Sequence, residues 1–449
     1  MVVDVLSEAG GRRDAIALIT SEASLSYGVL QEVVDARAET LRSAGMRAGR
    51  IEPVEVESDR DGIVELLALW RIGAVPVPLN PALTKRERDD ARTRLADPTV
   101  PAGTQVVVWT SGTSGRPRGV ALSWANLKES AQGTADRLAL TSDDVWLASL
   151  SMAHVGGLAL VVRSLMVGGG LVAAGVFRTE VVSSLLDGDG FPGGPAGRIT
   201  HLSLVPTQLL RLLDHRAGTP PPDTFRCALI GGAHAPASLV DRAHGDGWPL
   251  GLTYGATEMS SQIATAPPAL TRSKPGTVGL PMPGVELDVE PDGSIRTRGP
   301  TRALGYLGDV GPPLAEAGGW YRTGDLGHMD ADGHLWITGR RVDRIVSGGV
   351  TIDAVEVEEA LRSHASVVDV CVVGLPDEEW GERVAAWIEP ANDFDRGRLE
   401  AYLRGLVSPA KLPRVWRTEG QLPRNVNGKV NRAEVRAVLG GRGQADRLG

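Results

Sequence analysis

Short apolar runs alternate with segments of helical periodicity along the first part of the chain. Residues 16–19 and 74–78 are apolar and short, whereas residues 27–41 and 64–70 carry apolar side chains at the three- and four-residue spacing of a helix. Strands separated by helices in this way are typical of a parallel sheet with helices on its faces. The pattern therefore predicts an α/β fold.

Glycine marks the ends of several predicted strands farther along the chain. The alternation continues with expected strands at residues 144–149, 170–174 and 199–204 and an apolar helix at residues 158–166. Two more short strands, at residues 227–233 and 250–258, run into the glycine-containing sequences LIGGA and TYGATE. Because ligands of open parallel sheets collect at the carboxyl ends of the strands, we expect these ends to line one crevice.

The pattern changes again in the last third of the chain. Residues 285–340 are dense in turns and short strands, which indicates a smaller β subdomain. A new unit starts with the sequence SGG at residues 347–349 and a stretch of helical spacing at residues 355–361. We therefore expect a large domain at residues 1–340 and a compact α+β domain of about 100 residues at 341–449.

Composition and charge exclude several classes of protein. A chain of 449 residues with 42% apolar content is too long for one ordinary core, which agrees with at least two domains. No apolar run approaches the roughly 20 residues of a membrane helix, and the first residues lack the basic region of a secretory signal. We therefore expect a soluble, cytoplasmic protein without stable membrane insertion.

The net charge of −8 argues against nucleic-acid binding, because the sequence offers no concentrated basic face for it. Cys227 and Cys371 are too few and too far apart for a disulfide framework or a metal cluster.

The sequence TSGTSGRPRG at residues 110–119 is a candidate phosphate-binding loop. Its small side chains let backbone N–H groups approach a phosphate, while its hydroxyl groups and two arginines offer further donors. It is not a Walker A loop, because the only Gly-Lys pair of the chain, Gly428 with Lys429, is followed by valine. A flexible surface loop rich in Gly and Ser is the structural alternative.

Five motifs occur in an order and spacing found in one enzyme superfamily. They are TSGTSGRPRG at 110–119, YGATE at 254–258, YRTGD at 321–325, GR at 339–340 with SGG at 347–349, and PRNVNGK at 423–429. In these motifs nearly the whole chain resembles the acyl-adenylate-forming enzymes, which include acyl-CoA synthetases, luciferases and nonribosomal adenylation domains. The sequences HLSLVPTQ at 201–208 and MSSQIAT at 259–265, with the short length, resemble the o-succinylbenzoate-CoA ligases of menaquinone synthesis.

The resemblance implies a ligase that acts on a small-molecule carboxylic acid in two half-reactions. The carboxylate attacks the α-phosphorus of ATP to give an acyl-adenylate and pyrophosphate, and the CoA thiolate then displaces AMP. The implied cofactors are ATP, Mg²⁺ and coenzyme A as cosubstrate, and the small C-terminal domain is expected to move between the steps. Another aryl or acyl acid, a carrier protein as acceptor, and a homo-oligomer stay open. A non-catalytic nucleotide-binding homologue is a further alternative, against which the presence of both Glu258 and Lys429 argues.

The resemblance also implies nucleotide-binding roles for individual residues. The phosphates would be held by Thr110, Ser111, Gly112, Thr113, Ser114, Gly115 and Arg118. The family usually has lysine in place of Arg118, and arginine keeps the charge and adds bidentate contacts. The adenine and ribose would be bound by Gly231, Gly232, Ala233, Tyr254, Gly255, Asp325 and Arg340. Without the motifs, Asp325 would be interpreted as a turn former and Tyr254 as a core aromatic.

Four residues would carry the chemistry. Glu258 would hold Mg²⁺, a hard cation that prefers carboxylate and phosphate oxygens, and Thr257 would contact the α-phosphate. Lys429 would neutralise the charge that develops on the α-phosphate and the attacking carboxylate. His154 would separate the acyl pocket from the thiol path. Without the motifs, Glu258 and Lys429 would be interpreted as exposed charges.

The expected hinge and the thiol path lie next to each other in the sequence. Ser347, Gly348 and Gly349 would line the path of pantetheine, where larger side chains would block it. Val342 falls at the family's hinge position, where relatives often have Asp, Lys or Ser. The chain departs from the family there, because valine is stiff at χ1.

Arg163 lies within the apolar predicted helix at residues 158–166. Burying its charge without a partner is costly, and no acidic residue lies one helical turn away. Arg163 either reaches the surface at the helix end or meets a negatively charged ligand. Because o-succinylbenzoate carries a second, aromatic carboxylate, we hypothesise that Arg163 recognises it, with neutral contacts from Ser260, Ser261 and Gln262.

Overall fold

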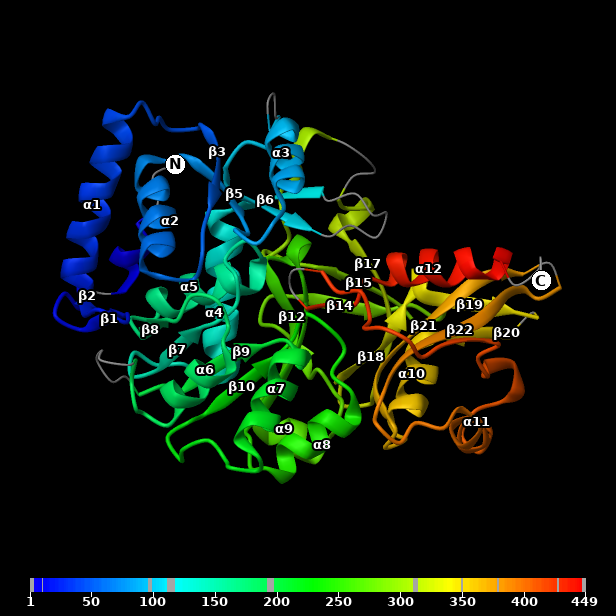
Figure 1. Ribbon diagram of the computed structural model, residues 1–449. Helices are drawn as coiled ribbons and strands as arrows, with labels where there is room; N and C mark the ends of the chain where they lie inside the picture. Colours follow the sequence, from blue (N-terminus) through cyan, green and yellow to red (C-terminus); the bar gives the residue numbers. More distant parts are fainter. Residues whose placement is uncertain are drawn as a thin grey trace.

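The computed structural model describes residues 4–9, 11–95, 99–110, 118–191, 198–309, 314–348, 350–377, 379–425 and 428–445. Two parts lie side by side in Figure 1, the larger drawn from blue to yellow-green and the smaller from yellow to red. We call residues 4–340 the large domain and residues 341–445 the small domain, which follows the boundary expected from the sequence.

A nine-stranded sheet forms the centre of the large domain. Its strands run in the order β13-β12-β11-β10-β9-β7-β8-β1-β2, and the run from β11 to β1 is parallel throughout. The strands are β1 (Ile16–Ile19), β2 (Ser24–Ser26), β7 (Val145–Ala148), β8 (Gly170–Ala173), β9 (His201–Leu204), β10 (Cys227–Ile230), β11 (Leu250–Ala256), β12 (Ser261–Ala266) and β13 (Leu280–Pro281). The predicted α/β fold with a parallel sheet is thereby confirmed.

Helices cover both faces of this sheet because successive strand residues point to opposite sides. In β7, Trp146 and Ala148 join the core under one group of helices, while Leu147 joins the core under the other. The first group is α1 (Tyr27–Ser43), α2 (Arg60–Ile72), α4 (Trp124–Leu138) and α5 (Val155–Met166). The second group is α6 (Thr179–Leu186), α7 (Pro206–Arg216), α8 (Ala237–Gly245) and α9 (Pro268–Ser273).

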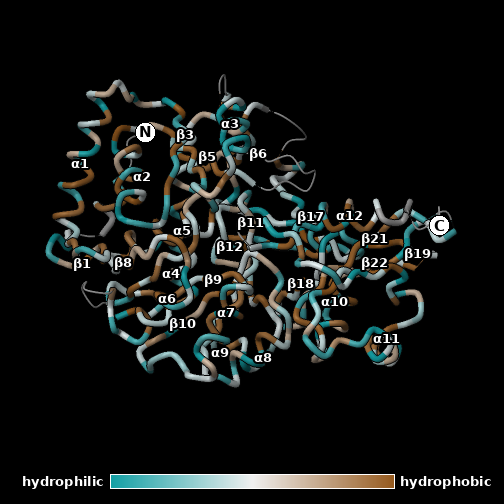
Figure 2. The backbone as a smooth tube through the Cα atoms, viewed as in Figure 1, coloured by the Kyte–Doolittle hydropathy of each residue, from teal (hydrophilic) through white to brown (hydrophobic). Residues whose placement is uncertain are grey.

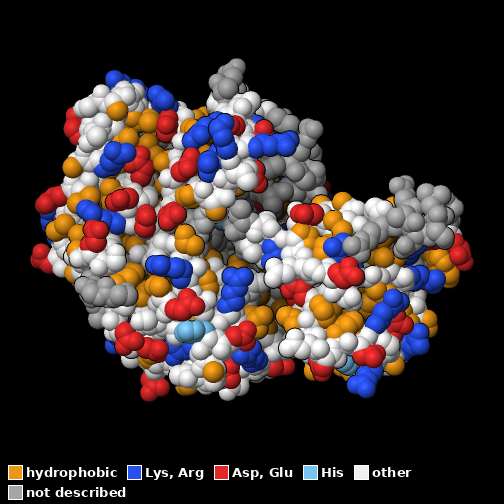
Figure 3. All heavy atoms as spheres, viewed as in Figure 1, with side chains coloured by type: hydrophobic (Ala, Val, Ile, Leu, Met, Phe, Trp, Pro, Cys, Tyr) orange, Lys and Arg blue, Asp and Glu red, His pale blue; other side chains and the backbone are white. Residues whose placement is uncertain are grey.

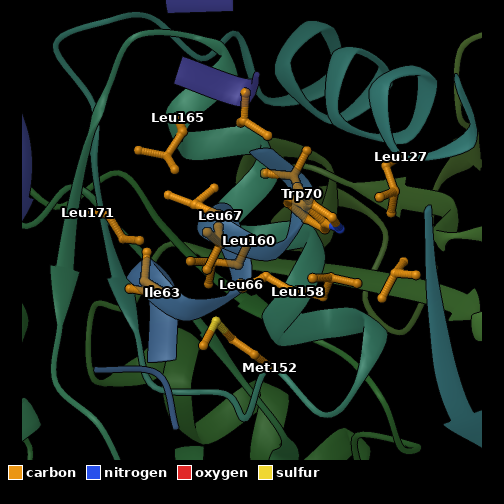
Figure 4. Packing of buried hydrophobic residues seen from close by; sticks show 14 of the residues in the cluster. Ile63, Leu66, Leu67, Trp70, Leu127, Met152, Leu158, Leu160, Leu165 and Leu171 are labelled. Carbon is orange, nitrogen blue, oxygen red and sulfur yellow. The ribbon is translucent and has the colours of Figure 1, made fainter. Parts of the chain in front are cut away.

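The core under the first group of helices is dense with large side chains. Leu66 and Trp70 of α2 pack beside Leu158 and Leu160 of α5 (Figure 4), and all four are fully buried. Burial of one such leucine stabilises the fold by about 1.5–3 kcal/mol. This core fixes α5 on the sheet, which matters because α5 carries two of the predicted site residues.

Smaller sheets and one polar helix complete the large domain. β3 (Ile51–Glu55) pairs with β4 (Val75–Leu79), and β5 (Thr104–Thr110) pairs with β6 (Arg118–Ser123), which also pairs with β16 (Gly305–Tyr306). The predicted β subdomain corresponds to an antiparallel sheet of β14 (Glu286–Val289), β15 (Ser294–Arg298), β17 (Tyr321–Met329) and β18 (Leu335–Arg340). α3 (Lys85–Arg94) is hydrophilic along its length (Figure 2) and has no buried residue.

The small domain has its own sheet and two cores. Its strands are β19 (Arg344–Ser347), β20 (Val350–Asp353), β21 (Val367–Asp377), β22 (Gly381–Pro390) and β23 (Val415–Arg417). Val370 and Val372 of β21 face α10 (Ala354–Arg362) and α11 (Arg396–Arg404), whereas Cys371 and Val373 face α12 (Arg432–Ala445). Alternating side chains of one long strand therefore bind helices on both faces of the sheet.

The two domains contact each other through charged side chains. Nε2 of His234, in the large domain, lies 2.7 Å from Oε1 of Glu359 on α10. Basic and acidic side chains are interspersed over the face shown in Figure 3. Among the described residues, no helix combines the length and apolar character needed to cross a membrane.

Candidate active site

A cavity of about 980 Å³ lies where the carboxyl ends of the parallel strands meet the small domain. Its lining includes Ser149 after β7, Val205 after β9, Gly231 after β10 and Gly255 near the end of β11. The strand ends that the sequence marks with glycine therefore open into one cavity. We call the part lined by Arg118, Glu258, Asp325, Arg340 and Lys429 the charged end, and the part lined by His154, Arg163, Ser203 and Gln262 the α5 end.

The predicted phosphate loop connects the two strands of a hairpin at the charged end. Thr110 ends β5 and Arg118 begins β6, and the two residues are paired in the ladder. Both line the cavity. Ser111, Gly112, Thr113, Ser114 and Gly115 lie outside the described residues, so their phosphate contacts stay predictions.

Glu258 lies in the short 3-10 turn Thr257–Met259 that follows β11, and its side chain is buried at the cavity wall beside Thr257. Tyr306 donates a hydrogen bond of 3.1 Å to Oε1 of Glu258, and Nη2 of Arg118 lies 3.8 Å from the same oxygen. The Arg118 guanidinium also lies 4.1 Å from the centre of the Tyr306 ring. A carboxylate that lines a cavity provides oxygen ligands of the kind that Mg²⁺ binds, so Glu258 fits this ion.

Tyr306 is a site residue that the sequence analysis missed. It comes from β16, which adds to the edge of the β5–β6 hairpin and has no spacing relationship with the motifs. Burial raises the pKa of Tyr306 well above its ordinary value, and the nearby Glu258 carboxylate raises it further. The tyrosine is therefore a permanent hydrogen-bond donor to Glu258 near neutral pH.

Asp325 and Arg340 face each other on neighbouring strands of the β subdomain. Asp325 on β17 is in register with Arg340 on β18, and their side chains form an ion pair with an Nε–Oδ1 distance of 2.7 Å. Tyr254 donates a hydrogen bond of 2.7 Å to the other carboxylate oxygen. Burial raises the pKa of Asp325, while the Arg340 guanidinium acts in the opposite direction. Asp325 and Arg340 line the cavity with acceptors and donors suited to a sugar diol.

Lys429 reaches the charged end from the small domain. The turn before it places the Lys429 side chain beside Gly232, which has a positive φ of 77°. An ideal Cβ on Gly231 would lie 2.6 Å from Cγ2 of Thr253, so both positions favour glycine for steric reasons. Burial lowers the pKa of Lys429 to about 8, and the nearby Arg340 contributes to the same shift.

Arg163 is buried at the α5 end and does not reach the surface. Only 2% of its side chain is exposed, and Nε donates a hydrogen bond of 3.1 Å to the carbonyl oxygen of Ala159. Nη1 has no hydrogen-bond partner among the described residues. His154 precedes the first turn of α5 and lines the same cavity. The first of the two alternatives derived from the sequence, a side chain extending into solvent, is therefore wrong.

The polar side chains that line the α5 end with Arg163 come from two strands. Gln262 of β12 and Ser203 of β9 line the cavity, and Gln262 Nε2 and Ser203 Oγ have no hydrogen-bond partner within the described parts of the chain. Ser261 also lines the cavity. Ser203 lies within the sequence HLSLVPTQ noted above, but no role was predicted for it.

Of the described residues predicted for the nucleotide and acyl sites, three do not line the cavity. Ser260 is fully buried and donates a hydrogen bond of 2.7 Å to the carbonyl oxygen of Thr301. Tyr254 packs into a core with Met259, and only its hydroxyl group approaches the site through Asp325. Ala233 follows the two lining glycines but is exposed outside the cavity. The structure thus shows Tyr254 supporting Asp325, and its predicted place over the adenine stays a prediction.

The thiol path is described only in part. Ser347 is buried at the end of β19, and Gly348 has a positive φ of 58°. Gly349 lies outside the described residues. Val342 lines the cavity at the junction of the domains and is 54% exposed.

Sequence comparison now adds independent information. Residues 86–307 match the AMP-binding enzyme family, and residues 356–429 match the AMP-binding enzyme C-terminal domain. The 2-succinylbenzoate–CoA ligase of Bacillus mycoides strain KBAB4 is 31% identical over 95% of this chain and 96% of its own length. The chain belongs to the AMP-binding enzyme family. It is accordingly an adenylate-forming acid–CoA ligase, and the motifs found in the sequence fall within the matched regions or beside them.

Solved structures of the family have the same fold. The o-succinylbenzoate CoA synthetase of Bacillus subtilis, in complex with its acyl-adenylate intermediate, has a TM-score of 0.84 at 27% identity, covering 96% of this chain and 97% of the synthetase. ATP-bound MatB of Rhodopseudomonas palustris has a TM-score of 0.86 at 24% identity and covers 98% of this chain, which shows the shared fold. The large N-terminal and small C-terminal domains are a family architecture.

Proposed function

We propose that this ligase acts on o-succinylbenzoate, an aromatic dicarboxylate, and transfers its succinyl-derived acyl group to CoA. Arg163 is the observation that carries the proposal. A buried guanidinium without a carboxylate partner is costly, and an anionic substrate group would offset that cost. The 2-succinylbenzoate–CoA ligases, at 30–31% identity, supply the candidate substrate.

The α5 end has the donors that a second carboxylate needs. Nη1 of Arg163, Nε2 of Gln262 and the hydroxyl group of Ser203 all lack partners within the described residues, and the three residues line one cavity. The ring carboxylate of o-succinylbenzoate can accept from the guanidinium, while the aliphatic carboxylate extends toward the charged end. His154 lines the α5 end at the start of α5 and would border the bound acyl chain.

The charged end supplies the groups for adenylation. Thr110, Arg118 and Thr257 would contact phosphate oxygens, and Asp325 with Arg340 would hold the ribose. Glu258 would hold Mg²⁺, which neutralises phosphate charge when bound. Lys429 would place its ammonium group between the attacking carboxylate and the α-phosphate, where negative charge accumulates in the transition state.

The arrangement of the two domains supports a resting state suited to adenylation. The TM-score is 0.84 against the B. subtilis synthetase with its acyl-adenylate and 0.66 against a double mutant of that synthetase with a product analogue. The coverage of this chain is 96% in both comparisons, so the lower score indicates a different placement of parts. For the second step, the small domain would turn so that Lys429 leaves and the segment around Gly348 enters.

A substrate screen with Arg163→Leu tests the proposal. The acids are o-succinylbenzoate, 4-oxo-4-phenylbutanoate (the same molecule without the ring carboxylate), malonate and benzoate, each assayed for CoA-thioester formation. We expect Arg163→Leu to reduce kcat/KM for o-succinylbenzoate by about 2–4 kcal/mol, or roughly 30- to 1,000-fold, because a charge-assisted contact is lost. The mono-acid should change little.

Arg211→Leu is the matched control, because Arg211 is an exposed arginine of the cavity lining away from α5. It should leave the ratio of kcat/KM for the two acids near that of the unmodified protein. Preference for malonate or benzoate in the screen, or a folded Arg163→Leu protein with full activity on the diacid, would reject o-succinylbenzoate as the substrate.

A further inference from the structure

Three side chains on neighbouring strands form a row beneath Arg163. Trp146 on β7 is in register with His201 on β9, and His201 is in register with Cys227 on β10. Their exposed fractions are 0%, 1% and 2%. The Arg163 guanidinium lies 5.1 Å from the centre of the Trp146 ring, and the His201 ring stacks on Trp146 at a centroid distance of 4.8 Å. Arg163 therefore rests on an aromatic stack that is itself outside the cavity lining.

An aromatic partner, unlike an acidic one, leaves the N–H donors of the Arg163 guanidinium available to a ligand. The π face attracts the guanidinium charge electrostatically, and the attraction is strongest in a dry environment. It occupies none of the N–H donors in a conventional hydrogen bond. Of these donors, Nε binds the Ala159 carbonyl and Nη1 has no partner among the described residues. A carboxylate in the place of Trp146 would instead neutralise the charge and compete with an anionic substrate.

The buried carboxylate closest in sequence to Trp146 is already neutralised by another arginine. Asp144 accepts from Arg226 at 2.6 and 2.7 Å and from Thr200 at 3.0 Å. Nδ1 of His201 lies 3.5 Å from Asp144, and burial lowers the pKa of His201 to about 4. The imidazole is therefore neutral at physiological pH and adds no repulsive charge beneath Arg163.

We propose that Trp146, with His201 stacked against it, is a positioning residue that holds Arg163 toward the substrate's second carboxylate and leaves the guanidinium donors open. The stack is thereby a determinant of dicarboxylate specificity. This inference rests on the proposed function, because it requires Arg163 to bind the ring carboxylate. It adds that the aromatic face, and not merely the volume of the side chain, is required.

Substitution of Trp146 separates the aromatic face from packing. Trp146→Phe keeps a smaller π face, whereas Trp146→Leu removes it. We expect Trp146→Leu to lower kcat/KM for o-succinylbenzoate by about 10- to 30-fold, mostly through KM, and Trp146→Phe by about 2- to 5-fold. Activity with 4-oxo-4-phenylbutanoate should stay within about 2-fold.

Trp70→Leu is the control, because Trp70 is fully buried in the same core and its ring N–H donates to the carbonyl oxygen of Gln105. Any loss of activity in this variant should be equal for both acids.

A double-mutant cycle tests whether Trp146 acts through Arg163. If it does, Trp146→Leu should have no further effect on the diacid in the Arg163→Leu background. Additive losses, or equal losses with both acids, would overturn the positioning role. If Arg163→Leu alone leaves the preference for the diacid unchanged, the proposed function itself fails. The two failures are therefore distinguishable within one set of proteins.

Fluorinated tryptophan provides a measurement that does not depend on the folding of the Trp146→Leu protein. Mono-, di- and trifluorotryptophan weaken the π face stepwise with little change in shape, and all 10 tryptophans of the chain would be replaced. The Kd for o-succinylbenzoate should rise with each fluorine in the unmodified chain and stay flat after Arg163→Leu. A flat series in the unmodified chain would reject the cation–π contribution.

Discussion

At the charged end of the cavity, Asp325 and Glu258 each have a partner within the protein, whereas Arg163 at the α5 end has none of opposite charge among the described residues. Asp325 binds Arg340 and Tyr254, and Glu258 accepts from Tyr306. Among the described residues, Arg163 contacts a backbone carbonyl and the face of Trp146. At these positions the protein compensates its carboxylates internally but leaves the Arg163 charge for a ligand.

This difference reflects how each end is built. The charged end is assembled from side chains of separate elements, namely β11, the β5–β6 hairpin, the β subdomain and the small domain. The α5 end belongs to the packed core of the large domain, where side chains have little freedom. We therefore infer that the charged end carries the chemistry common to the family, and the α5 end carries the choice of acid.

The largest expected effect concerns Lys429, the residue that the small domain contributes to the charged end. Lys429→Ala should reduce acid-dependent exchange of pyrophosphate into ATP by about 10²-fold or more, the scale for loss of one transition-state donor. Thioester formation from pre-made acyl-adenylate should be largely spared, because Lys429 would act only in the adenylating arrangement. Equal losses in the two half-reactions would contradict separate arrangements of the small domain.

Asp325→Asn should give the next largest effect. The substitution removes the negative partner of Arg340 and an acceptor for the ribose, so we expect the KM for ATP to rise by about 10- to 100-fold. Tyr254→Phe removes only the hydrogen bond to Asp325 and should raise the same KM by about 5-fold. Neither change should alter the preference between diacid and mono-acid. A shift in that preference would show that the two ends are coupled.

The loss of adenylation activity at alkaline pH should follow the deprotonation of Lys429. Its pKa is lowered to about 8, so the ammonium form predominates below pH 8 and is lost as the pH rises above it. We expect kcat/KM for ATP to fall by about 5-fold between pH 8 and 9 and by about 10-fold for each further pH unit, since one essential proton is lost. Lys429→Arg keeps its charge and should move this loss of activity to higher pH. An unchanged pH dependence in Lys429→Arg would assign the titration to another group.

The sequence predicted the features that depend on the spacing of residues along the chain. It did not predict the residues that reach the site because two strands distant in the sequence are neighbours in a sheet. The alternating pattern predicted the parallel sheet, and the apolar surroundings of Arg163 singled it out. Trp146 and Ser203 could not be found, because β7 and β9 are adjacent in the sheet but separated in the chain by β8. Tyr306 was missed for a similar reason, since β16 joins the β5–β6 hairpin from far along the sequence.

The motifs also did not predict whether a side chain points into the cavity or into the protein interior. Ser260 and Ser261 are neighbours, yet Ser260 hydrogen-bonds Thr301 inside the protein while Ser261 lines the cavity. Their positive φ values of 55° and 118° show an irregular backbone after Glu258, which no simple period anticipates. The neutral contacts predicted for Ser261 and Gln262 remain predictions.

The smallest expected effect concerns one of the contacts between the two domains, the pair of His234 and Glu359. Oε1 of Glu359 lies 2.7 Å from His234, and its Oε2 accepts a 3.4 Å hydrogen bond from the backbone of Ala237 at the start of α8. Both side chains are partly exposed, at 39% and 30%, so solvent screens the pair and its contribution is about 1 kcal/mol or less. Glu359→Gln should therefore reduce adenylation by about 2- to 5-fold.

The thioester step should respond differently, because the contact stabilises only the arrangement in which Lys429 occupies the charged end. With pre-made acyl-adenylate, Glu359→Gln should be as fast as the unmodified protein or faster. Glu356→Gln is the matched control, since Glu356 lies on the same helix and pairs with Lys411 within the small domain. It should leave the ratio of the two half-reactions unchanged. If both substitutions slowed both steps alike, the His234–Glu359 pair would contribute to general stability and not to the balance between domain arrangements.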